Sequence, residues 1–94
     1  MNKVNAKKAI QLAVTQGRVS FTRHAIDRMA EREINRKMVF AALQHGRINR
    51  EPERSPGKAA LECKLDYYEA GERFSVIVGI VDADPSLIVI TVLE

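Results

Sequence analysis

The sequence contains little of what is typical of extracellular or membrane proteins. Cys63 is the only cysteine among the 94 residues, so no intramolecular disulfide can form, as is usual in a reducing compartment. No apolar run approaches the ~20 residues that span a bilayer. The N-terminal segment has neither an apolar signal-peptide core nor a small-residue cleavage site. We therefore expect a cytoplasmic protein that does not associate with membranes.

Motifs of the common cofactor and metal sites are also missing. The sequence has no phosphate-binding Walker loop, no nucleophile elbow and no dinucleotide fingerprint. Two histidines distant from each other in the chain, together with a single cysteine, do not make a zinc site. No internal repeat, low-complexity tract or long linker divides the chain. We expect a single domain over residues 1–94, with no metal and no cofactor.

Acidic residues are scarce in the first half of the chain. Residues 1–50 carry eleven lysines and arginines against three acids, a charge of +8, whereas residues 51–94 carry four against nine, a charge of −5. A basic half is a candidate surface for a polyanion such as RNA. A solvated helical surface, where lysine and arginine are common, would show the same excess. Charge alone leaves both interpretations open.

The hydrophobic pattern changes its period once, near residue 47. Before that point apolar residues recur at the helical spacing, which predicts three helices. Their expected N-caps are Asn5, Thr22 and Asn35. Their expected ends are Gly17, about Glu33 and Gly46. Between the first two helices, residues 19–21 alternate and form a short extended segment.

The second half reads as strands. A short strand begins at Ile48, and residues 51–57 form a loop because they hold two prolines and a glycine. Residues 61–67 alternate as a half-buried strand, and residues 69–72 form a hairpin turn. The runs 74–81 and 87–93, joined by residues 82–85, are apolar on both faces and therefore central. Short links predict antiparallel pairing. The expected fold class is α+β, with N-terminal helices packed on one face of an antiparallel sheet of about four strands.

The most informative segment runs from Phe21 to Arg32 and reads FTRHAIDRMAER. At about 100° per residue, a helix separates its apolar residues from its polar ones. The apolar side comprises Ala25, Ile26, Met29 and Ala30. The other side carries His24, Asp27, Arg28 and Glu31, with Arg32 on the boundary. We call this polar side, together with the neighbouring Arg23, the helix edge.

Three residues of the helix edge are our candidate catalytic residues: His24, Arg28 and Arg32. His24 lies in the first turn, where backbone N–H groups and the helix dipole attract anions. An arginine fork binds phosphate oxygens in a bidentate manner, and a histidine exchanges a proton near neutral pH. Arg23 is a further candidate for RNA binding. Ordinary ion pairs of these arginines with Asp27 and Glu31 on a solvated face are the alternative, with a capping or surface role for His24.

In the strands, four further residues are candidates for RNA binding: Lys64, Tyr67, Arg73 and Thr91. They would support the RNA backbone or stack on a base. Tyr67 and Tyr68 point to opposite faces, so one of them is expected to be exposed. Packing for the tyrosines and a filler role for Thr91 are the alternatives. We expect structural roles for His45, at a helix end, and for Cys63, in the core.

The motif F-T-x-H-A-x-x-R-M-x-E-R, followed by Ile34 and a terminal I-x-I-T-V strand from Ile88 to Val92, resembles a bacterial domain family of unknown function. Its members often lie beside a gene for a small YgiT-type zinc-finger protein. That arrangement is similar to the MqsR–MqsA toxin–antitoxin system, in which MqsR is a messenger-RNA-cleaving toxin with a RelE-like fold. The element order is similar to that of MqsR throughout. The catalytic lysine, glutamine and tyrosine of MqsR are not matched, since Glu62 and Phe74 fall near the last two, and MqsR lacks the histidine of position 24.

The resemblance implies a RelE/MqsR-like domain that acts as the toxin of a type II toxin–antitoxin system. Our leading hypothesis is a metal-independent endoribonuclease, with RNA as substrate. His24 would act as general acid or base, while Arg28 and Arg32 stabilise the phosphate charge. The expected partner is a cognate antitoxin, of which a YgiT-type zinc-finger protein is one candidate, and a homodimer is left open. The alternative is a non-catalytic module that binds RNA or a protein, because no second acid or base accompanies His24.

Overall fold

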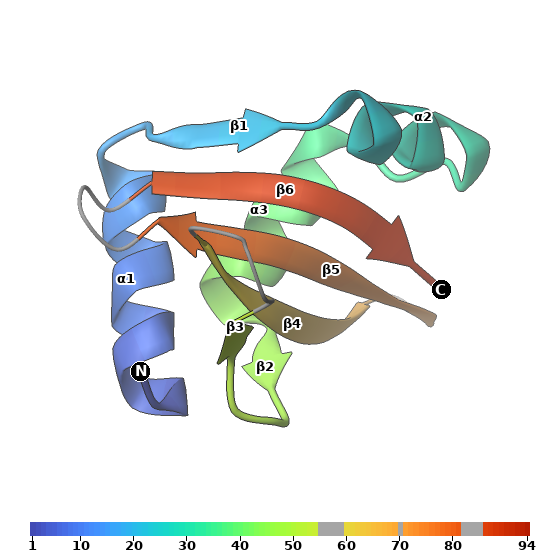
Figure 1. The fold of residues 1–94 in the computed structure, drawn as a ribbon. Helices are drawn as coiled ribbons and strands as arrows, with labels where there is room; N and C mark the ends of the chain where they lie inside the picture. The colour runs from blue at the N-terminus through green and yellow to red at the C-terminus, as the bar shows by residue number, and fades with distance from the viewer. Residues whose placement is uncertain (55–59, 70, 82–85) are drawn as a thin grey trace.

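The computed structural model describes residues 1–54, 60–69, 71–81 and 86–94. That part of the chain forms three helices and a six-stranded sheet (Figure 1). One strand lies between the first two helices in the chain, and the other five follow the third helix. In chain order the elements are α1 (Lys3–Thr15), β1 (Val19–Phe21), α2 (Arg23–Glu31), α3 (Arg36–His45), β2 (Arg47–Ile48), β3 (Glu53–Arg54), β4 (Ala60–Glu69), β5 (Glu72–Val81) and β6 (Ser86–Leu93). The α+β class is confirmed. The expected connection over residues 82–85 lies outside the described residues.

Side-chain oxygens at the helix starts explain where the helices begin. Thr22 and Asn35 cap α2 and α3 as predicted, each accepting a hydrogen bond from the backbone N–H three residues on. The predicted cap of α1 is wrong. Asn2 is the cap, because its Oδ1 accepts from the N–H of Asn5 at 2.8 Å, which places Asn5 inside the first turn.

Each helix is followed by a residue that has either a left-handed backbone conformation or no space for a side chain. After α1, Gly17 has a φ of 70°, a conformation that glycine adopts without strain. After α2, Glu33 has a φ of 55°, so the helix ends at Glu31, two residues before the predicted position. At the end of α3, a Cβ on Gly46 would collide with the carbonyl oxygen of Ala42, which explains the glycine there.

The sheet has the strand order β1-β6-β5-β4-β2, with β3 also paired to β4. It is larger than the expected four strands for two reasons. The extended segment at residues 19–21 joins the sheet as β1, and Glu53 and Arg54, inside the predicted loop, pair with Glu62 and Leu61 of β4 as β3. The β4–β5 hairpin is confirmed. The sheet is mixed rather than antiparallel, because β1 runs parallel to β6.

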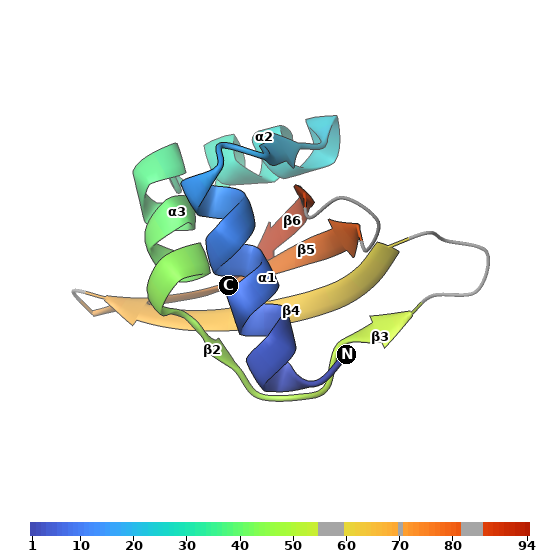
Figure 2. The ribbon, with the colours of Figure 1, turned by 90° about the vertical axis from the view of Figure 1, so that its left-hand side faces the viewer.

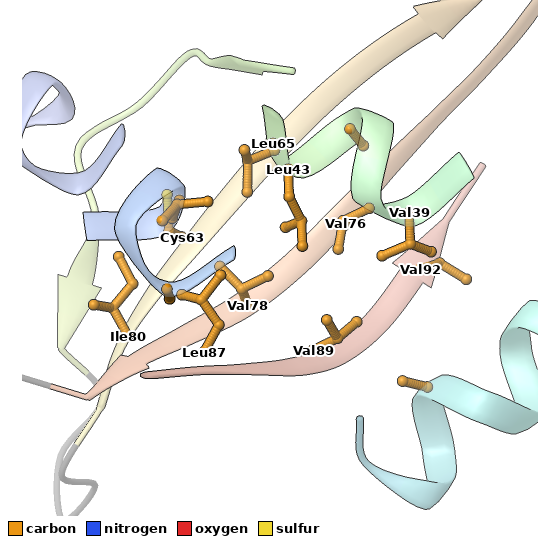
Figure 3. Close-up of a cluster of buried hydrophobic side chains, with 14 of the residues drawn as sticks. Val39, Leu43, Cys63, Leu65, Val76, Val78, Ile80, Leu87, Val89 and Val92 are labelled. Atoms are coloured by element: carbon orange, nitrogen blue, oxygen red, sulfur yellow. The ribbon is translucent and has the colours of Figure 1, made fainter. Parts of the chain in front are cut away.

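One face of the sheet carries the hydrophobic core, which α1 and α3 cover (Figure 2). Leu65, Val76 and Val89 from three neighbouring strands are fully buried against Val39 and Leu43 of α3 (Figure 3). Each such side chain contributes about 1.5–3 kcal/mol by leaving water. The helices therefore lie on one face of the sheet, as predicted, except that α2 contacts β6 beyond the end of β1.

Cys63 belongs to this core, as predicted, with 2% of its surface exposed. Burial raises the pKa of its thiol to about 11, although the positive charges of Lys7 and Arg50 lower it in part. Lys7 in turn donates from Nζ to the carbonyl oxygen of Gly46 at 2.7 Å, which ties α1 to the end of α3. Cys63 is thus a packed and protonated side chain.

A β-bulge in β6 sets which of its side chains face the core. Ile77 pairs with Thr91 whereas Val78 pairs with Val89, so Ile90 is an extra residue in the ladder. Because of this insertion Val92 points into the core and Thr91 points to the opposite face. That opposite face, which we call the open face, has no described helix upon it and is turned toward the viewer in Figure 1.

Candidate nucleic-acid interface

Helix α2 is attached to β6 through its capping residue. The backbone N–H of Thr22 donates to the carbonyl of Val89 at 3.0 Å, and its hydroxyl donates to the carbonyl of Ile90 at 2.9 Å. The same hydroxyl oxygen accepts from the N–H of Ala25 at 3.0 Å. One donor of the helix N-terminus is therefore already satisfied, which reduces what this end offers to a phosphate.

The apolar side of α2 is narrower than the sequence predicts. Ala25 and Met29 are buried, but Ile26 is 45% exposed and Ala30 also lies in solvent. The two-residue anchor suits a helix that contacts the side of a single strand rather than the broad face of a sheet. Much of the circumference of α2 is consequently open to solvent, the helix edge included.

The arginines of the helix edge have carboxylate partners. Arg28 Nη1 lies 3.1 Å from Glu31 Oε2, and Arg23 Nε lies 3.6 Å from Asp27 Oδ1. Arg32 Nη1 lies 2.7 Å from Glu94 Oε1, just beyond β6, and only 24% of the Arg32 side chain is exposed. The structure therefore shows the predicted pairing with Asp27 and Glu31 for Arg23 and Arg28, whereas Arg32 pairs with Glu94 instead.

His24 lies in the first turn of α2 and is exposed. Within the described residues its imidazole has no hydrogen bond or ion pair. The structure thus places His24 and Arg28 on α2, as predicted, with Arg32 directly after the helix, but directs the two arginines to different carboxylates. No described group orients the imidazole for proton transfer.

The open face brings together residues that the sequence analysis selected separately. On β4, the side chains of Lys64, Asp66 and Tyr68 alternate with the buried ones and so point to this face. Arg73 of β5 lies opposite Tyr68, and Ser75 lies opposite Asp66. Three predicted RNA-binding residues therefore share the open face: Lys64, Arg73 and, through the bulge, Thr91.

The exposed tyrosine is Tyr68, with 65% of its surface in solvent, whereas the predicted candidate was Tyr67. Tyr67 is half-buried and packs edge-to-face on Phe74, with ring centroids 5.8 Å apart. The alternation of β4 explains the exchange, because Tyr67 falls in register with the buried Leu65. A base-stacking role therefore fits Tyr68 better.

A groove of ≈ 590 Å³ includes residues of the open face and extends past the end of the sheet to Tyr67 and to His45 of α3. It lies over the ends of β2, β4 and β5, and we call it the sheet groove. Its lining residues are His45, Arg47, Asn49, Lys64, Asp66, Tyr67, Tyr68, Arg73, Ser75 and Glu94. Glu94 also holds Arg32, so the last turn of α2 reaches the rim of the groove.

Asp66 organises the polar side chains of the groove. Its Oδ1 accepts from Ser75 Oγ at 2.5 Å and its Oδ2 accepts from Asn49 Nδ2 at 2.6 Å, while Lys64 Nζ lies 4.0 Å away. Partial burial raises the pKa of Asp66, but these two hydrogen bonds and the charges of Lys64 and Arg50 outweigh it. The pKa consequently lies below its ordinary value, and the carboxyl group is ionised at neutral pH.

Two arginines of the groove have no such partner. Arg47 lies opposite Asp66 on the edge strand β2, and Arg73 lies at the start of β5. Both are exposed, and neither guanidinium has an ion pair or hydrogen bond within the described chain. His45, in the last turn of α3, lines the same groove. The sheet groove therefore combines uncommitted cations with an imidazole.

A model of one protein family matches residues 21–94, and its description is a domain of unknown function, DUF4258. The chain belongs to the DUF4258 family. The matched region of this DUF4258 domain contains α2, α3, strands β2 to β6, the last residue of β1 and every lining residue of the groove. Comparison with the curated proteins and with the solved structures returned no match.

Sequence reasoning missed six lining residues of the groove in this DUF4258 domain: His45, Arg47, Asn49, Asp66, Ser75 and Glu94. They come from α3, β2, the segment after β2, β4, β5 and the residue after β6, so no local spacing connects them. The alternation of β4 places Asp66 beside Lys64 and Tyr68, which was the one available signal. Across the described residues, no three His, Cys, Asp or Glu side chains are grouped to hold a metal ion. None of the described helices is long and apolar enough to cross a membrane.

Proposed function

We propose that this DUF4258 domain binds single-stranded RNA in the sheet groove and cleaves it as a metal-independent endoribonuclease. The observation that carries the proposal is that the uncommitted arginines Arg47 and Arg73 line the same groove as His45. Arginine forks bind phosphate oxygens, and exposed aromatic rings such as Tyr68 stack on bases. The helix edge supports the proposal less well, because carboxylates occupy its arginines.

The proposed reaction needs no metal. The ribose 2′-hydroxyl attacks the adjacent phosphorus, the bond to the 5′ oxygen of the next nucleotide breaks, and a 2′,3′-cyclic phosphate and a 5′-hydroxyl result. His45 takes the proton of the attacking hydroxyl or protonates the leaving oxygen. Arg47 and Arg73 stabilise the charge that builds on the phosphate. His24, with Arg28 and Arg32, is the second candidate set for the same reaction.

A comparison of the two histidines tests the proposal. Purified protein is incubated with fluorescent single-stranded RNA in the presence of EDTA, and products are resolved by electrophoresis. His45→Ala is expected to lower cleavage about 100-fold or more, as the loss of a general acid or base does, whereas His24→Ala cleaves like wild type. Lys37→Ala, which removes an exposed charge of α3 outside the groove, is the matched control.

If only His24→Ala lost RNA cleavage, the active site would be assigned to the helix edge instead. Equal cleavage by both variants would reject both sites. A wild-type protein that binds RNA and leaves it intact would establish the second candidate function, a non-catalytic RNA-binding module. That alternative is favoured by one observation: within the described residues neither histidine has a hydrogen-bond partner to orient its ring.

We further propose that the domain is the toxin of a type II toxin–antitoxin system, with a RelE/MqsR-like fold. The resemblance of the Phe21–Arg32 motif and the sheet placed after the helices support it. Its partner would be an antitoxin, a YgiT-type zinc-finger protein being the first to test. Expression of the domain alone should arrest bacterial growth, and co-expression of the neighbouring gene should restore it. Harmless expression of a soluble, folded domain would contradict the toxin role.

A further inference from the structure

The sheet groove contains a carboxylate that phosphate binding does not explain. Asp66 lies in a row that crosses three strands on the open face, between Arg47 of β2 and Ser75 of β5. Its negative charge repels phosphate, and so weakens the binding that Arg47 and Arg73 favour. An ionised carboxylate in the sheet groove favours a ligand group that donates hydrogen bonds to it.

The carboxylate of Asp66 is held in one orientation and still has capacity to accept. Ser75 donates to Oδ1 and Asn49 donates to Oδ2, so each oxygen has one protein partner. A carboxylate offers about four lone-pair positions, which leaves one on each oxygen. The side chain is 35% exposed, so a ligand in the groove can reach it. Two acceptors fixed side by side match a ligand with two adjacent donors.

An aromatic platform lies next to this acceptor pair. Tyr68 is two residues along β4 from Asp66, projects from the same face and is 65% exposed. Arg73 lies directly opposite Tyr68 on β5 and lines the same groove. A base stacked on the Tyr68 ring would present its edge along the strand toward Asp66, with its phosphate within reach of Arg73.

We propose that the sheet groove selects guanine, with Asp66 accepting from N1–H and from the N2 amino group while the base stacks on Tyr68. Guanine is the common base that carries two adjacent donors on one edge. Adenine and cytosine each offer one amino group beside a ring nitrogen lone pair, which the carboxylate repels, and uracil offers a single N–H between two carbonyls. This inference rests on the proposed RNA binding and names the nucleotide that the groove prefers.

Binding measured by fluorescence anisotropy tests the preference directly. The probes are uridine hexamers, 2′-O-methylated so that they cannot be cleaved, either all-uridine or with guanine, inosine or adenine at one central position. We expect the guanine probe to bind about tenfold more tightly than the adenine probe, since a good bidentate contact discriminates by about 5- to 150-fold. Inosine, which keeps N1–H and lacks the amino group, should fall between them.

Variants assign the preference to Asp66. Asp66→Asn should bind the guanine and adenine probes equally, because an amide offers one acceptor and one donor. Its affinity for the all-uridine probe should be unchanged or higher, since a negative charge is removed. Ser75→Ala retains the carboxylate and should keep the guanine preference, and Tyr68→Ala should weaken all probes alike. Thermal melts monitored by circular dichroism establish that each variant is folded.

The outcomes distinguish this inference from the function on which it rests. Equal affinity of wild-type protein for guanine, inosine and adenine probes would overturn the guanine preference and leave RNA binding in place. A guanine preference that persists in Asp66→Asn would overturn the role of Asp66. No binding to any probe at low salt would overturn the proposed function itself. The wild-type comparison needs no variant, so it stands even if a substitution prevents folding.

Discussion

The helix edge of α2 and the sheet groove both carry arginines, but only those of the groove lack a carboxylate partner within the described residues. On α2, residues three or four apart are neighbours, so Asp27 and Glu31 lie within 3.6 Å of Arg23 and Arg28. In the groove, Arg47 and Arg73 come from strands on either side of β4. Asp66 between them is engaged by Ser75 and Asn49. Side chains of equal charge therefore differ in what they can bind according to their nearest carboxylates.

The largest expected effect is on RNA affinity, measured after two arginines are removed either from the sheet groove or from the helix edge. The double variant Arg47→Ala/Arg73→Ala should bind single-stranded RNA at least tenfold more weakly. The slope of log affinity against log salt concentration should fall by about 1.4, since each phosphate contact to a single strand contributes about 0.7. Anisotropy titrations over a range of KCl concentrations measure both quantities.

The matched double variant Arg23→Ala/Arg28→Ala removes the same charge from the helix edge. Its affinity should change by less than about threefold, because both arginines already have carboxylate partners that screen them. Similar losses in the two double variants would contradict the distinction between the regions. A greater loss at the helix edge would reverse it.

A second prediction concerns the attachment of α2. Thr22→Ala should lower the free energy of unfolding by about 1–2 kcal/mol, the usual cost of a lost N-cap with a further hydrogen bond. Thr22→Ser keeps the hydroxyl and should be close to wild type. Urea denaturation measures the change. Hydrogen exchange should become faster in α2 and stay unchanged in β4 and β5, whereas a uniform change across the chain would show that α2 and the sheet unfold together.

A third prediction concerns pH and the groove alone. The pKa of Asp66 is lowered in the folded state, so its ionised form stabilises the fold above the unfolded value of about 4. This contribution is lost as the pH falls below that value and through the lower pKa of the folded state. Asp66→Asn should therefore lose less stability than wild type between about pH 5 and pH 2, as measured by thermal melts. Parallel curves for the two proteins would show that Asp66 does not contribute.

The smallest expected effects are those of single ion pairs at the helix edge. A double-mutant cycle on Arg32 and Glu94 should give a coupling energy of up to about 1 kcal/mol, because the arginine is mostly buried and the pair is close. The cycle on Arg23 and Asp27 should give a few tenths of a kcal/mol at most, since both side chains are largely exposed. Equal couplings would indicate that burial of Arg32 adds nothing.

Local signals in the sequence predicted the local features of this fold. Thr22 and Asn35 were recognised as caps because a capping oxygen acts on an N–H only three residues away. The buried positions of β4 followed from strict alternation, which also explains the exposure of Tyr68. The sequence also predicts the helix edge of α2, but it leaves open whether the arginines there bind phosphate or pair with carboxylates.

Features that depend on distant parts of the chain were missed. Nothing near residues 19–21 shows that they run parallel to β6, since that pairing joins segments almost 70 residues apart. Glu53 and Arg54 form β3 because β4 offers a free edge, which no turn residue in their own loop indicates. The groove combines α3, three strands and two residues outside any element, so Asp66 and its partners Ser75 and Asn49 could not be associated before the strand register was known.

Ile90, the extra residue in β6, helps to position α2 and has no partner in the ladder with β5. The strand pairs with β5 as though Ile90 were skipped, so the core position of Val92 and the outward position of Thr91 do not need its side chain. The carbonyl oxygen of Ile90 instead accepts a hydrogen bond from the hydroxyl of Thr22. A chain one residue shorter at this point would keep both faces of the sheet and lose an anchor of α2. Changes of length here, rather than substitutions, are the route by which this fold would reorient its helix without rebuilding its groove.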